Sequence, residues 1–359
     1  MKRILTLDGG GIRGIFTLQI LKRIETMFRE REGRQDLVLS DVIDFFAGTS
    51  TGAIIATCLS WGMTVQEIED MYVDHGAAMF ARARWYKRFR AKYRSDRMSA
   101  LFQEIFSDSA GQPALLGTDR LKTMLLVVMR NATTGSPWPI SNNPAAMFNQ
   151  LDSEDCNLEI PLWQLLRAST AAPTYYAPER ITIGKQSFLF VDGGISPYDN
   201  PSLLAVFMAT LPAYNVHWPA GRDKLHVISV GTGVTRSLLG DGDPGKINIL
   251  QQVSYVPMAL LESISDEQDL VCRVLGACVH GSDIDLEIGG LNEPSLFDPT
   301  EQKFTYARFN ARLDVADKTW LPKPLAKATL DDLKLIPRLQ EIGQAYADRH
   351  VKPEHLDPA

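Results

Sequence analysis

The apolar positions of the first third of the chain predict two strand–turn–helix units. Residues 3–7 (RILTL) are a short apolar run, typical of a buried strand, and a glycine-rich turn follows at 8–14 (DGGGIRG). Beyond this turn, apolar residues recur at the spacing of a helix: Ile15, Leu18, Leu21, Ile24 and Phe28. The second unit runs from 37–48 through 48–52 (GTSTG) into a helix that is apolar on nearly every side, and that we therefore expect to be buried.

Three later apolar runs continue the pattern, at 123–129 (TMLLVVM), 187–191 (SFLFV) and 225–230 (LHVISV). Their continuous apolar character is typical of a parallel sheet that is covered on both faces. The alternation of strands and helices predicts a three-layer α/β/α fold with a mostly parallel central sheet. We expect an irregular loop at 131–151, because this segment is rich in Asn, Pro, Gly and Ser.

Composition places the chain among globular proteins. Its 359 residues are 45% hydrophobic and 22% charged, which excludes disordered and fibrous classes and allows one large or two smaller domains. Four scattered cysteines do not form a disulfide framework, so we expect a reduced, cytoplasmic protein. No secretory signal is expected, and the uncharged stretches 45–66 and 200–221 lack the continuous apolar span of a transmembrane helix.

Charge is uneven along the chain. The net charge of −6 argues against a surface built to hold nucleic acid. Residues 82–97 are the exception, since eight Arg and Lys against one Asp give +7 there and leave −13 elsewhere. Basic and aromatic side chains together suit the headgroup layer of an anionic membrane, a nucleotide, or simply a solvated helix face. The contact candidates in this stretch are Arg82, Arg84, Trp85, Lys87, Arg88 and Arg90.

The segment GTSTG matches the G-x-S-x-G elbow, in which a serine lies on a sharp turn between a strand and a helix. Ser50 is that serine, and Gly48 and Gly52 on either side would let a substrate approach. The helix that follows would point its N-terminus at the site. The alternative is a Ser/Thr-rich helix start in which the side chain only caps the helix.

The segment DGGGIRG carries three consecutive glycines after a strand. Their backbone N–H groups can converge on one point, as an oxyanion requires, and Arg13 adds a positive charge. The competing interpretation is a dinucleotide fingerprint formed by Gly9, Gly11 and Gly14, with Asp41 as the acid that binds the ribose.

The third motif is VDGG at 191–194. An apolar strand delivers Asp192 to a turn at Gly193 and Gly194 that leaves its carboxylate exposed at the strand's end. Such a carboxylate can equally be a structural turn former. The segments 168–176 (ASTAAPTYY) and 229–233 (SVGTG) also have the character of turns at a sheet edge.

Taken together and in this order, DGGGIRG, GTSTG and VDGG resemble the patatin-like phospholipase family over residues 3 to about 235. The resemblance implies a catalytic domain at 3–235 and a C-terminal region, 236–359, that completes or caps the core and is a candidate for regulation. It implies Ser50 as nucleophile, Asp192 as general base, and an oxyanion hole of Gly9, Gly10 and Gly11 supported by Arg13. The remaining motif positions are Asp8, Gly14, Gly48, Gly52, Gly193 and Gly194.

The family's substrates are acyl esters of lipids, typically phospholipids, and we expect neither a metal nor an organic cofactor. None of the six histidines lies in a comparable turn, so a Ser–Asp dyad fits better than a Ser-His-Asp triad. His226, inside an apolar run, is expected to be packed in the core. No acidic loop has calcium-ligand spacing, so no calcium requirement is expected.

The chain further resembles bacterial patatin-like effectors of cyclic-oligonucleotide anti-phage signalling, which implies activation by a cyclic dinucleotide and peripheral action on the inner face of the membrane. The alternatives are a constitutive lipase of lipid metabolism and a non-hydrolytic nucleotide-binding module. A nucleic-acid-binding protein would rest on 82–97 alone and conflicts with the overall charge. Headgroup preference and oligomeric state do not follow from the sequence.

Overall fold

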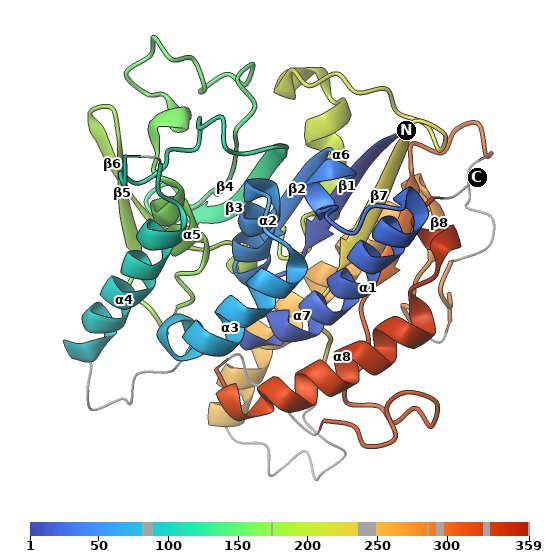
Figure 1. Cartoon of the computed structure of the whole chain (residues 1–359). Helices are drawn as coiled ribbons and strands as arrows, with labels where there is room; N and C mark the ends of the chain where they lie inside the picture. The colour runs from blue at the N-terminus through green and yellow to red at the C-terminus, as the bar shows by residue number, and fades with distance from the viewer. Residues whose placement is uncertain are drawn as a thin grey trace.

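The computed structural model describes residues 1–80, 89–108, 110–173, 175–235, 249–285, 287–291, 298–325 and 331–357. In these residues nine strands form a single sheet with the order β5-β6-β3-β2-β1-β7-β9-β8, and β4 pairs with β3 outside that path. Figure 1 shows the sheet between two layers of helices. The strands are β1 (Lys2–Leu7), β2 (Phe45–Thr49), β3 (Met124–Asn131), β4 (Pro137–Ser141), β5 (Glu179–Ile183), β6 (Gln186–Asp192), β7 (Leu225–Val230), β8 (Ala277–His280) and β9 (Thr305–Phe309).

The centre of the sheet is parallel, as predicted. β1 pairs in parallel with β2 and β7, β2 with β3, and β9 with β7 and β8. Every residue of β2 and β7 is buried, which confirms that helices cover both faces.

The two faces of the sheet hold separate apolar clusters, because successive strand residues point to opposite sides. Leu5 and Phe46 join the first cluster, while their neighbours Ile4 and Phe45 join the second. Helices of the first face are α1 (Gly14–Glu32), α2 (Thr51–Trp61), α3 (Val65–Phe80), α4 (Phe89–Ile105), α5 (Leu162–Ser169) and α8 (Ile336–His350). Those of the second are α6 (Ser202–Thr210) and α7 (Ile249–Leu275). The predicted three-layer fold is confirmed.

Two sequence-based expectations are wrong at one side of the sheet. The continuous apolar run 187–191 predicts a strand of a parallel sheet, but β6 is antiparallel to both β3 and β5. Its connection to β5 is a tight hairpin through Gly184, which has φ 56°, and such a hairpin joins only antiparallel strands. The segment 131–151 is not entirely a loop, since β4 pairs with β3 within it. β4 contains Pro137 and Pro139, which an edge strand tolerates.

The chain beyond residue 236 contributes to the same sheet. β9 pairs with β7, and β8 pairs with β9. The acidic stretch 262–270 lies within α7, and α8 packs along α1. No helix in the described ranges is long and apolar enough to cross a membrane.

Candidate active site

Ser50 lies on the sharp turn between β2 and α2. Its backbone has φ 53° and ψ −120°, a region in which a residue with a side chain is strained. The turn is closely packed, since a Cβ atom on Gly52 would lie 2.2 Å from the carbonyl oxygen of Leu7, at the end of β1. The side chain of Ser50 makes no capping hydrogen bond to its own helix. The turn therefore has the geometry of a nucleophile elbow, and capping does not explain the serine.

Strand register brings Asp192 to this elbow. In the pairing with β3, Thr49 at the end of β2 lies opposite Val128, and Asp192 at the end of β6 lies opposite Met129. β4 already occupies the other edge of β3 at these residues, so β2 and β6 share one edge. Because β2 runs parallel and β6 antiparallel to β3, their carboxyl ends meet head to head. Residues 142 positions apart in the chain thus become neighbours.

The two side chains are hydrogen-bonded. Ser50 Oγ donates to Asp192 Oδ2 at 2.8 Å, and the N–H of Gly194 donates to Asp192 Oδ1 at 2.7 Å. Asp192 is only 6% exposed, so the expectation of an exposed carboxylate at this strand end is wrong. Burial raises the pKa of Asp192 to about 6, against the lowering effect of the Gly194 and Ser50 hydrogen bonds. The site therefore pairs a strained serine with a carboxylate that is more basic than an ordinary aspartate.

Ser169 links the elbow to β3 through two hydrogen bonds, a role that the sequence pattern does not predict. Its hydroxyl accepts from the N–H of Ser50 at 2.9 Å and donates to the carbonyl of Val128 at 2.6 Å. The sequence of 168–176 predicts only a turn at a sheet edge. The role of this hydroxyl depends on where β2 and β6 end along β3. No local sequence pattern indicates where these strands end.

The glycine turn lies beside the elbow. A Cβ atom on Gly9 would lie 3.5 Å from the Cβ of Ser50. The N–H of Gly9 donates to the backbone carbonyl of Asp199 at 3.2 Å, so this donor is already used. In the described part of the chain, the N–H groups of Gly10 and Gly11 have no hydrogen-bond acceptor. Two of the three predicted oxyanion donors are thus available.

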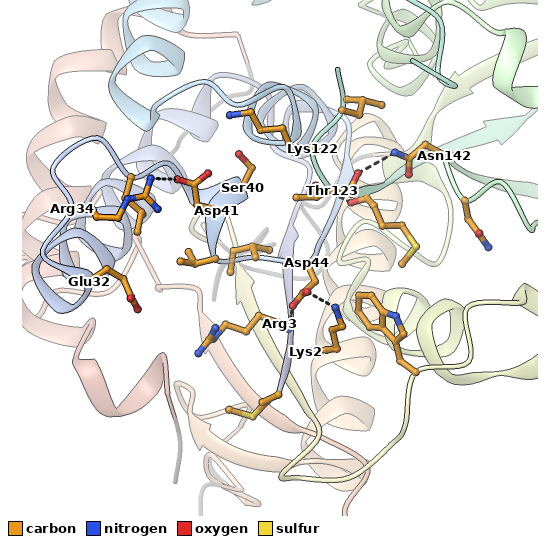
Figure 2. Close-up of a pocket in the computed structure, with 18 of the residues that line it drawn as sticks. Lys2, Arg3, Glu32, Arg34, Ser40, Asp41, Asp44, Lys122, Thr123 and Asn142 are labelled. Atoms are coloured by element: carbon orange, nitrogen blue, oxygen red, sulfur yellow. Dashed lines mark hydrogen bonds and ion pairs between the residues drawn. The ribbon is translucent and has the colours of Figure 1, made fainter. Parts of the chain in front are cut away.

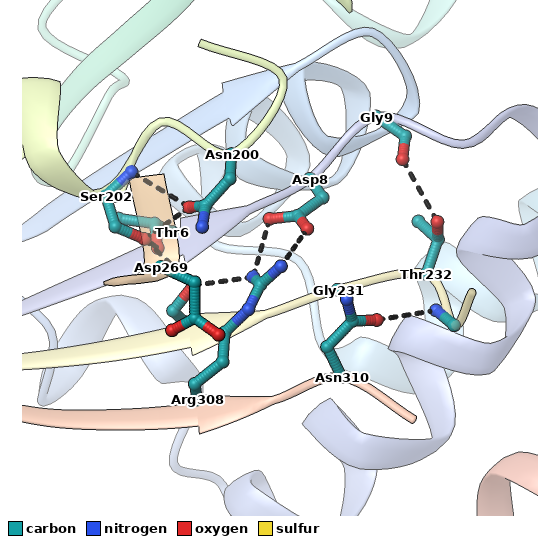
Figure 3. Close-up of polar contacts among 12 residues, drawn as sticks. Thr6, Asp8, Gly9, Asn200, Ser202, Gly231, Thr232, Asp269, Arg308 and Asn310 are labelled. Atoms are coloured by element: carbon teal, nitrogen blue, oxygen red, sulfur yellow. Dashed lines mark hydrogen bonds and ion pairs between the residues drawn. The ribbon is translucent and has the colours of Figure 1, made fainter. Parts of the chain in front are cut away.

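Side chains from β9 and from the segment after β7 hydrogen-bond to the glycine turn (Figure 3). The guanidinium of Arg308, on β9, donates to both carboxylate oxygens of Asp8 at 2.8 and 2.5 Å, and both side chains are buried. Thr232, which follows β7, donates through its hydroxyl to the carbonyl of Gly9 at 3.0 Å. The segment 229–233 therefore fixes the turn.

Replacing Arg308 with methionine should lower the free energy of unfolding by about 3–5 kcal/mol, because it leaves the Asp8 carboxylate buried without its partner. Denaturant unfolding measures the change. Arg338→Met is the matched control, since Arg338 pairs with the exposed Glu341 and should cost less than about 1 kcal/mol. The double variant Asp8→Asn with Arg308→Met should recover part of the loss. Equal effects of the two arginine substitutions would contradict this account of the turn.

Arg13 and the basic stretch 82–97 were the predicted positively charged contacts. Arg13 is half-buried beside the glycine turn, and its Nη1 donates to the carbonyl of Gly233 at 2.8 Å. The contact candidates of the basic stretch at 82, 84, 85, 87 and 88 lie outside the described residues, and at Arg90 only the backbone is described, in α4.

The structure contradicts the dinucleotide-binding alternative at Asp41. A ribose-binding acid follows its strand, whereas Asp41 precedes β2 and pairs with Arg34 at 3.1 Å. All six histidines are described, and none hydrogen-bonds Ser50 or Asp192. His226 is fully buried, and burial lowers its pKa to about 4, which confirms that it is packed in the core.

A cavity of about 800 Å³ opens at the amino ends of β1 and β3, away from the elbow (Figure 2). Its cations are largely compensated by nearby carboxylates: Lys2 pairs with Asp44 at 2.6 Å, and Arg3 with Asp357 at 2.6 Å. We therefore assign no chemistry to it. No group of three or more His, Cys, Asp or Glu in the described ranges is arranged to hold a metal ion.

Comparison with known proteins identifies the family. Residues 5–206, more than half of the chain, match the patatin-like phospholipase family model. The chain is 28% identical over 278 residues to the cGAMP-activated phospholipase of Vibrio cholerae serotype O1, with 75% of each sequence covered. It is 26% identical over 252 residues to Patatin-17 of Solanum cardiophyllum, covering 66% of this chain and 61% of that one, less than two thirds of its length.

Among solved structures, VipD from Legionella pneumophila aligns with 97% of this chain and 67% of its own at 14% identity, with a TM-score of 0.42 that is too low to support a conclusion. The family assignment rests on the match over residues 5–206, which includes the glycine turn, the elbow and Asp192. The chain belongs to the patatin-like phospholipase family of lipid-hydrolysing enzymes.

Proposed function

We propose that this chain hydrolyses fatty-acyl esters of membrane phospholipids, with Ser50 as nucleophile and Asp192 as its general base. The observation that carries the proposal is the 2.8 Å hydrogen bond between the strained elbow serine and a buried carboxylate from another strand. Nucleophile and base within hydrogen-bond reach are the signature of an activated hydroxyl. The family assignment supports the lipid ester as substrate.

In the first step, Ser50 Oγ bonds to the carbonyl carbon of the ester while its proton passes to Asp192 Oδ2. The carbonyl oxygen becomes an oxyanion, for which the N–H groups of Gly10 and Gly11 are the proposed donors. The positive N-terminus of α2 lies at the same point. When the intermediate collapses, the ester C–O bond breaks and the leaving alcohol takes the proton from Asp192. The acyl group remains on Ser50.

Water then completes the cycle. It attacks the acyl carbonyl while Asp192 accepts one of its protons, and the second oxyanion uses the same donors. Collapse releases the fatty acid and returns the proton to Ser50 Oγ. Removing one oxyanion donor typically costs about 3–4 kcal/mol of transition-state stabilisation, so the glycine turn supplies much of the acceleration that a weak base such as aspartate does not.

The proposal extends to where and when the enzyme acts. We place it at the inner membrane surface, with residues 82–97 as the contact, because basic and aromatic side chains interleave there.

We also propose activation by a cyclic dinucleotide. The name of the Vibrio cholerae relative supports this, as does the resemblance of the motif set to nucleotide-controlled effectors.

Fatty-acid release from anionic phospholipid vesicles tests both parts. Wild type and Ser50→Ala are assayed alone and with a panel of cyclic dinucleotides. Release that needs both Ser50 and one nucleotide is the expected result. Release without nucleotide would keep the hydrolase and remove the activation proposal, leaving a constitutive lipase. Wild-type release equal to that of Ser50→Ala in every condition would contradict the assigned nucleophile.

A further inference from the structure

A second carboxyl group, that of Asp199, lies in the same site as the proposed dyad. Its Oδ1 is 2.9 Å from the point where a Cβ atom on Gly194 would sit, and Asp192 Oδ1 is 3.1 Å from that same point. The two oxygens are therefore at most about 6 Å apart. Asp199 Oδ1 is also 2.2 Å from the Cβ position of Gly9, beside Ser50. The carboxyl thus borders both the base and the glycine turn.

No hydrogen bond or ion pair reaches the Asp199 side chain from any residue that the structure describes; only its backbone carbonyl is used, by the N–H of Gly9. The two cations whose charges lower the pKa of Asp199 have other partners. Arg13 donates to the carbonyls of Gly233 and Gly10, and Arg308 is held by Asp8. The side chain of Asp199 is half-buried, and neither cation is bound to its carboxyl group.

The position matters for the charge that forms during the reaction. Negative charge develops on the substrate's carbonyl oxygen, at the N–H groups of Gly10 and Gly11 that follow Gly9. An ionised carboxylate within a few ångströms opposes this charge, whereas a neutral carboxyl does not. A negative charge on Asp199 therefore opposes the oxyanion, and protonation removes that opposition.

We propose that Asp199 is an inhibitory titratable group of the ester-hydrolysing site: when neutral it permits oxyanion stabilisation, and when ionised it suppresses turnover. This inference rests on the proposed function. It assigns Asp199 no bond to the substrate and no proton transfer, only a charge that opposes the transition state.

The charged groups facing Asp199 set the pH at which it acts. Burial and the negative charges of Asp8 and Asp192 raise the pKa of Asp199 to about 7, while Arg13 and Arg308 lower it. Asp192 must be ionised to accept the serine proton, which requires a pH above about 6. Activity therefore needs Asp192 ionised and Asp199 neutral, and it should rise through about pH 6 and fall through about pH 7.

The test is the pH profile of kcat/KM on a soluble short-chain ester between pH 5 and pH 9, with the acid product measured. Wild type should show a bell, and Asp199→Asn should lose the descending limb while keeping the rise near pH 6. The ratio of kcat/KM at pH 9 to that at pH 6.5 should increase at least about tenfold in Asp199→Asn. Asp223→Asn, at an exposed aspartate paired with Lys224, should keep the wild-type ratio.

Asp199→Ser, which also removes the charge, serves as a second variant in case the asparagine disturbs folding, and melting temperatures are compared for all proteins. An unchanged ratio in both variants overturns the proposal, and so does loss of hydrolysis at every pH in a folded variant. Failure of the proposed function would give a different result, because Ser50→Ala would then hydrolyse the ester as fast as wild type.

Discussion

Replacing Ser50 with alanine should lower ester hydrolysis by at least about 10⁴-fold, the largest effect that we expect from any substitution. The variant has no hydroxyl to attack the carbonyl, and the Asp192 carboxylate has no proton to accept. Initial rates of fatty-acid release from vesicles, and of acid release from a soluble ester, measure the loss. Both substrates should be affected alike, because the defect lies in the chemical step and not in contact with the membrane.

Ser50→Gly separates chemistry from folding. Glycine adopts φ 53° without the strain that serine carries, so this variant should be as inactive as Ser50→Ala but melt at a higher temperature. Ser263→Ala, on the exposed side of α7, should leave the rate unchanged. Hydrolysis by folded Ser50→Gly within tenfold of wild type would contradict the assignment of Ser50.

Asp192→Asn should reduce turnover by about 10³- to 10⁴-fold. The amide keeps the size of the carboxylate but cannot accept the proton of Ser50. The wild-type rate should rise as pH increases through about 6, since burial holds the pKa of Asp192 there and the neutral form is no base. The residual rate of Asp192→Asn should lack this rise. If the residual rate of Asp192→Asn still rose through about pH 6 as in wild type, the ionisation would belong to another group.

The same substitution should make the protein more stable. The folded-state pKa of Asp192 is above that of an unfolded aspartate, so its stabilising contribution is present at low pH and lost as pH rises through about 6. At pH 7.5 the buried charge should cost about 1–3 kcal/mol, which Asp192→Asn avoids. Denaturant unfolding at pH 7.5 and pH 4 checks this, and the gain should shrink at the lower pH. An equal gain at both pH values would mean that charge is not its cause.

Much of the fold was predictable because its signals are local. Strands such as 225–230 are continuous apolar runs, and the turns after β1 and β2 have glycines where backbone segments pack closely. These patterns also place Ser50, Asp192 and the glycine turn at the carboxyl ends of strands. These local patterns do not predict the direction of β6, which a hairpin makes antiparallel to β5. They also do not predict β4, because its prolines are unusual in a strand.

The missed parts of the site depend on contacts between distant segments. Ser169 donates a hydrogen bond to the carbonyl of Val128, which lies between the ends of β2 and β6. Arg308 reaches Asp8 from 300 positions away, and Asp199 is notable only because no described donor faces it. The residues next to Ser169, Arg308 and Asp199 in the sequence do not indicate these distant neighbours. The one nearby signal was that 168–176 and 229–233 have turn character at a sheet edge.

The most direct test of the dyad is covalent trapping of the nucleophile. Wild type is incubated with a fluorophosphonate, in the state that releases fatty acid, and its peptides are mapped by mass spectrometry, with Asp192→Asn in parallel. The account predicts one adduct, on Ser50, formed at least about 10³-fold more slowly in Asp192→Asn. An adduct on another residue, or equal labelling of Ser50 in the two proteins, would contradict the assignment of Ser50 activated by Asp192.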